Sequence, residues 1–78
     1  MSDVDRTPLL DLEAPYRRAV KLDHVVFDSG MAMLRVVIRE GHRITQIDLD
    51  PATARAWGAA MVDWAGRVEA GEPVVAAD

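Results

Sequence analysis

Few side chains in this 78-residue sequence belong to the types that carry out catalysis. A catalytic nucleophile needs a base within hydrogen-bond reach and a third group that orients the base. The sequence has no cysteine, and Ser29 lies between Asp28 and Gly30 with no histidine beside it. Serine in such a turn usually hydrogen-bonds to nearby backbone. We therefore predict no catalytic residue at Ser29.

The two histidines fall on different predicted elements. His24 is expected in mid-strand, facing the core, and His42 at the tip of a hairpin. They would lie at opposite ends of paired strands, too far apart to share a metal ion within one chain. Asp48 and Asp50 lack the further oxygen ligands of a calcium loop. The sequence therefore predicts no metal site and no cofactor, and we expect a protein that is not an enzyme.

Composition restricts the location and the partners. The net charge of -4 opposes a general attraction to nucleic-acid phosphates. The apolar stretches are far shorter than the roughly 20 residues of a membrane span, and the acidic N-terminus does not resemble a signal peptide. We expect a cytoplasmic protein with no membrane partner. Arginine supplies almost all of the positive charge, and alanine is abundant. Both features favour an origin in a GC-rich bacterial genome.

The small size raises a stability problem. A domain of this length buries only about 60% of the surface that its unfolded chain exposes. Small folds usually gain stability from disulfides, a structural metal or oligomerisation. Without cysteine, disulfides and thiolate metal sites are excluded, and oligomerisation is the option that remains.

Two turn signals divide the middle of the chain into strands. The segment Asp28-Ser29-Gly30 suits a three-residue hairpin turn with glycine in the left-handed region, and Gly41-His42 suits a type II′ turn. The second turn pairs Glu40 with Arg43 and continues the register to Leu34 and Leu49. Apolar alternation around these turns predicts three strands, over about 17–27, 31–40 and 43–49.

A helix is predicted over about 51–70. Asp50 is a good N-cap, and Pro51 suits the first helical position because its missing N–H costs nothing there. Four large apolar residues share one side of this helix, at spacings of four, three and four: Trp57, Met61, Trp64 and Val68. We expect this stripe to cover the inner face of the sheet.

These elements predict an α+β fold, an antiparallel three-stranded meander followed by one C-terminal helix. The domain is expected over 16–71, after a flexible N-terminal arm (1–15) and before a C-terminal tail (72–78). Terminal segments are the least ordered parts of most domains. Alternatively, the leucines of the arm dock on the body or grip a partner: Leu9, Leu10 and Leu12.

The outer face of the sheet, which one helix cannot cover, is the predicted interface. Large exposed apolar patches usually mark interaction sites. Arg35 is expected between Asp23 and Asp48 on neighbouring strands, in an ion-paired row. The protein is thus predicted to bind a second copy, or a subunit of a larger enzyme complex, through this face. The predicted contact residues are Val25, Phe27, Met31, Met33, Arg35, Val37, Arg39 and Ile44.

Two other functions stay open. Arg35, Arg39 and Arg43 with Phe27 resemble a platform for single-stranded nucleic acid, on which bases stack and arginines contact phosphates. Acidic residues between the arginines disfavour this alternative. A small-ligand or catalytic site across a dimer seam would need one of the two histidines.

Two resemblances bear on these alternatives. Strands followed by Leu49-Asp50-Pro51 and a tryptophan-bearing helix are similar to the closing half of the positive-cofactor, Whirly-like fold that binds single-stranded DNA. That family has a lysine-rich, aromatic sheet, whereas Lys21 is the only lysine here. The run from Asp28 to Asp50 resembles small uncharacterised bacterial proteins that are associated with operons for multicomponent oxygenases. This second resemblance implies an accessory, assembly or regulatory role and brings no functional residues.

Overall fold

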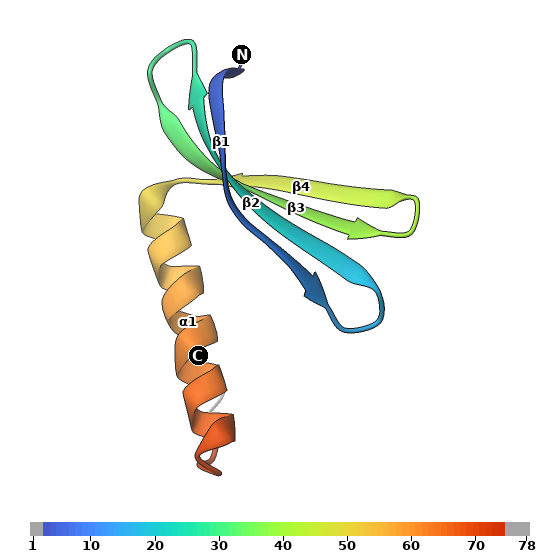
Figure 1. Ribbon diagram of the computed structural model, residues 1–78. Helices are drawn as coiled ribbons and strands as arrows, with labels where there is room; N and C mark the ends of the chain where they lie inside the picture. The colour runs from blue at the N-terminus through green and yellow to red at the C-terminus, as the bar shows by residue number, and fades with distance from the viewer. Residues whose placement is uncertain (1–2, 75–78) are drawn as a thin grey trace.

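The protein forms a four-stranded antiparallel sheet followed by one helix (Figure 1). The computed structural model describes residues 3–74. The strands lie side by side in chain order: β1 (Asp3–Ala14), β2 (Arg18–Phe27), β3 (Ala32–Glu40) and β4 (Arg43–Leu49). The helix is α1 (Pro51–Glu69). The predicted α+β class is confirmed, but the prediction of three strands is wrong.

The additional strand is β1, in the segment predicted to be a flexible arm. Asp3–Ala14 pairs with β2 along the edge of the sheet. The pairing register shifts between Asp3 and Asp5 and between Pro8 and Leu10, so pairing with β2 continues although the residues of β1 do not alternate regularly. An edge strand tolerates Pro8 because it leaves one side of the backbone unpaired. Residues 1 and 2 of the predicted arm, and 75–78 of the predicted tail, lie outside the described residues.

Both predicted glycine turns are confirmed. Gly30 has φ +87° and donates its N–H to the carbonyl of Phe27 at 2.9 Å. Gly41 has φ +61°, and the register runs from Glu40 opposite Arg43 to Leu34 opposite Leu49. Because side chains alternate along a strand, this register fixes which residues share each face of the sheet.

The start of α1 is also as predicted. The Asp50 carboxylate accepts a hydrogen bond from the backbone N–H of Thr53 at 3.1 Å, and Pro51 occupies the first turn. The cap satisfies one of the backbone donors that a helix start leaves without a partner. Asp50 is also the only residue between β4 and α1, so the cap fixes the junction between sheet and helix.

Loss of this cap should destabilise the fold. We expect Asp50→Ala to lower the free energy of unfolding by about 1 kcal/mol. Asp50→Asn keeps a side-chain oxygen and should stay within a few tenths of a kcal/mol of the wild type. Urea denaturation monitored by circular dichroism measures both. Equal losses in the two variants would mean that the cap contributes nothing.

The prediction that α1 covers the inner face of the sheet is wrong. Figure 1 shows α1 leaving the end of β4 and extending away from the strands. No described residue of α1 is buried, and Trp57 and Trp64 are 38% and 57% exposed. The connection at Asp50 is a single residue, which is shorter than the usual strand-to-helix connections of about 2–6 residues and leaves little chain for a turn back over the sheet.

The core of the described chain is consequently small. Its buried apolar residues are Val36 and Leu49 on the inner face and Val25 on the outer face. In Figure 1, β2 and β3 bend strongly, so that the β2–β3 and β3–β4 turns point in different directions. The large apolar side chains that remain exposed lie on both the sheet and α1.

Candidate protein interface

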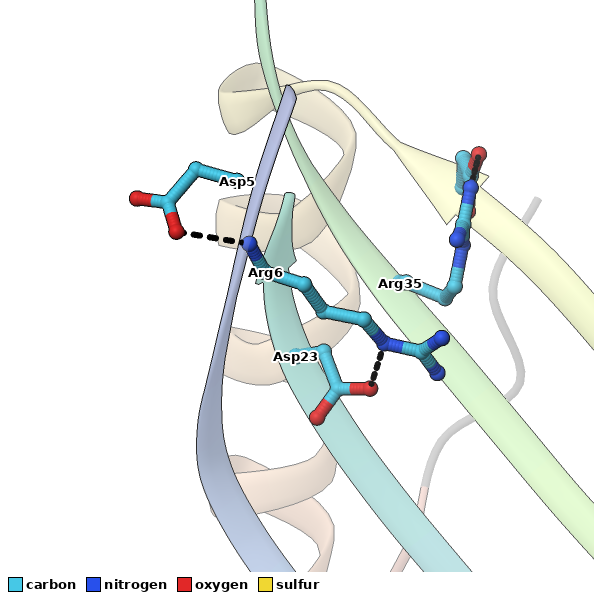
Figure 2. Close-up of polar contacts among 5 residues, drawn as sticks. Asp5, Arg6, Asp23 and Arg35 are labelled. Atoms are coloured by element: carbon cyan, nitrogen blue, oxygen red, sulfur yellow. Dashed lines mark hydrogen bonds and ion pairs between the residues drawn. The ribbon is translucent and has the colours of Figure 1, made fainter. Parts of the chain in front are cut away.

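A row of alternating charges crosses the outer face of the sheet, with one residue from each strand. Arg6 Nε donates to Asp23 Oδ2 at 2.8 Å, and Arg35 Nε donates to Asp48 Oδ1 at 2.9 Å. Arg35 Nη2 also donates to Asp48 Oδ2 at 3.1 Å, so this pair is bidentate. Figure 2 shows Arg6 reaching from β1 across β2 to Asp23, with Arg35 on β3 beside them. The row therefore links β1 to β2 and β3 to β4 through side chains.

The centre of this row is buried. The side chains of Asp23 and Arg35 are only 4% and 9% exposed. The predicted position of Arg35, between Asp23 and Asp48, is confirmed by the register. Sequence reasoning missed Arg6, because residues 1–15 were not interpreted as a strand. Reading Arg6 as a strand residue would have revealed it, since it lies opposite Val25 and so on the outer face.

The charge row predicts a specific acid sensitivity. The hydrogen bond from Arg35 holds the pKa of Asp48 below its ordinary value of 3.8, and the charges of Arg35 and Arg6 add to this effect. Stabilisation by this carboxylate is thus fully present above pH 3.8 and is lost as pH falls through the lower folded-state pKa. Asp48→Asn should be less stable than the wild type at pH 7, and the difference should shrink below about pH 4. Urea denaturation at pH 7 and at pH 2.5 tests this, and a difference that is unchanged by acid would contradict it.

The structure separates the predicted contact residues into buried and exposed groups. Val25 is completely buried and Arg35 is held by Asp48, so burial removes both from the surface that a partner could touch. Phe27, Met33 and Val37 are half-buried. The exposed residues are Met31, Arg39 and Ile44. Arg39 and Ile44 are cross-strand neighbours, whereas Met31 lies beside the β2–β3 turn at the other end of β3. The exposed contact residues therefore do not form one patch.

One uncovered apolar surface lies on α1. Trp57, Met61, Trp64 and Val68, called the α1 stripe below, are all exposed. The indole rings of Trp57 and Trp64 line a shallow open groove with Met61 and two alanines. Tryptophan is the residue that most often dominates the energy of protein interfaces. The α1 stripe therefore has the composition of a binding surface.

A second uncovered apolar surface is the inner face of the sheet. Leu10 and Leu12 on β1 lie opposite Leu22 and Val20 on β2, and Ile47 lies opposite Val36 on the other side of the sheet. Leu10, Leu12 and Ile47 are exposed. Two leucines of the predicted partner-binding arm are thus part of this face, whereas Leu9 is exposed at the register shift in β1.

The residues considered for chemistry remain apart. Ser29 Oγ accepts a hydrogen bond from the backbone N–H of Met31 at 3.4 Å, which is the local role expected in a turn. His24 is half-buried and lines a shallow apolar depression at the junction of sheet and helix, together with Leu34, Leu49 and Pro51. His42 lies in the β3–β4 turn. Within residues 3–74, no group of three or more His, Asp or Glu side chains is placed to hold a metal ion.

Comparison with known proteins gives one match. A family of unknown function (DUF6967) matches residues 3–67. The chain belongs to this family. The DUF6967 match begins in β1 and ends near the end of α1, so it spans the sheet, the junction at Asp50 and the α1 stripe as far as Trp64. No curated protein and no solved structure matches this DUF6967 chain.

Over the described residues, no helix is both long and apolar enough to cross a bilayer. Most of the large apolar residues of α1 lie on one stripe, and charged residues such as Arg55, Asp63 and Arg67 lie between them in the sequence. The helix is thus amphipathic, with one largely apolar side.

Proposed function

We propose that this protein is a non-enzymatic interaction protein of the cytoplasm, which acts as a homodimer or as an accessory, assembly or regulatory subunit of a larger bacterial enzyme complex. The exposed α1 stripe carries this proposal. Within the described residues, four large apolar side chains at helical spacing are left 38–57% exposed. Contiguous exposed apolar surface of this kind marks interaction sites in soluble proteins.

The α1 stripe supports binding more strongly than the outer face of the sheet does. The ion-paired row of Arg6, Asp23, Arg35 and Asp48 occupies the centre of the outer face. A partner that covered this row would have to desolvate the charge of Arg6, whose side chain is 50% exposed. Met31 and Ile44 remain available at its two ends. We therefore assign the main contact to α1 and a secondary one to the ends of the outer face.

The accessory role rests on the resemblance to small proteins that are associated with operons for multicomponent oxygenases. The nucleic-acid alternative receives no specific support. Arg35, the central cation of that surface, is engaged in a bidentate pair with Asp48. The dimer-seam site for a ligand receives none either, because His24 is surrounded mainly by apolar side chains.

Sedimentation velocity of the purified chain over a wide concentration range tests the proposal. The mass of one chain is 8.6 kDa, and we expect self-association at micromolar concentrations. If the chain alone is monomeric, a stoichiometric complex with a defined subunit of the native host would still support the accessory role. A folded 8.6-kDa monomer that forms no such complex would contradict the proposal.

A further inference from the structure

The single chain buries too little surface for a folded protein of its mass. Its accessible surface is 6240 Å², whereas a compact monomer of this mass exposes about 4,700 Å². Its radius of gyration is 15.0 Å, compared with about 12 Å for a compact domain of this length. The excess surface, about 1,500 Å², is larger than the roughly 800 Å² that each partner buries in a standard stable interface. The missing burial therefore corresponds to the contact surface of a further chain.

The two uncovered apolar surfaces of the chain have complementary shapes. A helix stripe packed on a sheet face is the usual two-layer arrangement of α+β domains. The α1 stripe extends about 16 Å along the helix from Trp57 to Val68, and β4, the shortest strand, is about 23 Å long. The stripe therefore fits within the inner face that Leu10, Leu12 and Ile47 line.

The two surfaces do not meet within one chain. Asp50 is the only connecting residue, and its hydrogen bond to Thr53 fixes the direction in which α1 leaves β4. Figure 1 shows the helix running away from the strands beyond this junction. Short connections of this kind favour exchange of an element between copies, because the chain cannot close on itself.

We propose that two copies of this chain form a symmetric dimer in which the α1 stripe of each copy packs on the inner face of the other copy's sheet. The proposal rests on the proposed function and names the partner. A two-fold arrangement covers the α1 stripe and the inner face of each copy in one closed assembly. A contact of helix against helix alone would leave both inner faces in water. The exchange is therefore the arrangement that covers both the α1 stripe and the inner face of the sheet.

Cysteine cross-linking tests the exchange on a background without native cysteine. Met61→Cys places a thiol on the α1 stripe, and Ile47→Cys places one on the inner face. Both side chains are exposed in the single chain, so the substitutions should not prevent folding. The two variants are mixed, unfolded and refolded together, and then oxidised. We expect a disulfide-linked dimer that contains one chain of each variant, identified by mass spectrometry.

Val62→Cys is the matched control, because Val62 is adjacent to Met61, lies off the stripe and is 75% exposed. It should yield at least tenfold less mixed dimer with Ile47→Cys. A Met61→Cys/Ile47→Cys double variant that forms its disulfide within one chain would overturn the exchange. Dimers linked only through Met61→Cys would overturn it as well, while leaving the proposed interaction function intact. A folded monomer without any cross-link would overturn the exchange. The proposed function would be contradicted as well only if this monomer also formed no complex with a host subunit.

Discussion

Arg35→Met lowers the free energy of unfolding by about 3–5 kcal/mol, the expected cost of removing one partner from a buried ion pair. The substitution keeps most of the apolar stem but leaves the carboxylate of Asp48 without its bidentate partner. The side chains of Arg35 and Asp48 are only 9% and 24% exposed, so water replaces the lost ion pair only in part. Urea denaturation at a fixed protein concentration measures the effect.

Arg39→Met is the control for this prediction. Arg39 lies on the same strand and the same face as Arg35, four residues further along, and is exposed. A surface substitution of this kind usually changes stability by less than about 0.5 kcal/mol. The interpretation of the charge row as a structural feature would be wrong if the two variants lost the same amount.

We expect Trp64→Glu to weaken the association of two chains by at least about 100-fold in Kd. Trp64 lies at the centre of the α1 stripe, and truncating a central tryptophan of an interface costs 2–4 kcal/mol. A loss of 2.7 kcal/mol corresponds to a 100-fold change in Kd, and the carboxylate adds the cost of burying a charge. Sedimentation equilibrium measures the dissociation constant directly.

Val62→Glu provides the comparison, because it adds the same charge to the same helix away from the stripe. We expect its Kd to lie within about threefold of the wild type, in line with the small effects of residues outside an interface. Circular dichroism should show both variants to be helical. Equal weakening by the two substitutions would indicate a general charge effect and would refute the assignment of the stripe.

The elements from β2 to α1 could be predicted because their signals are local. Gly30 and Gly41 have positive φ values that glycine adopts without strain, and each sets the register of a hairpin. Asp50 and Pro51 mark the start of the helix in the same direct way. Where turn chemistry and alternation agreed, the predicted pairs were found in the sheet.

The strand β1 could not be predicted by these rules. Its turn places Tyr16 and Arg17 at positive φ, where glycine or asparagine would normally give the signal. Pro8 and the consecutive leucines also break the alternation of a regular strand, and the register shift near Pro8 restores the pairing. Without β1, the position of Arg6 in the charge row could not be recognised.

The position of α1 relative to the sheet also could not be predicted from the sequence pattern. Helical periodicity shows that Trp57, Met61, Trp64 and Val68 share one face, but it does not identify the surface that covers them. The direction of α1 depends on the one-residue junction at Asp50 and on the bend of the strands. Side-chain alternation along the strands also identified which residues share the outer face. It did not reveal that the centre of this face is buried, because alternation carries no information on what covers a face.

The central claim is that another chain covers the α1 stripe, and the accessibility of the tryptophans tests it most directly. Both tryptophans of the protein lie on this stripe, so their fluorescence reports on no other site. We predict that acrylamide quenches this fluorescence weakly when the chain is associated, and more strongly on dilution as dimers dissociate. Quenching as strong as that of free N-acetyltryptophanamide at every concentration, in a chain that circular dichroism shows to be folded, would contradict the account.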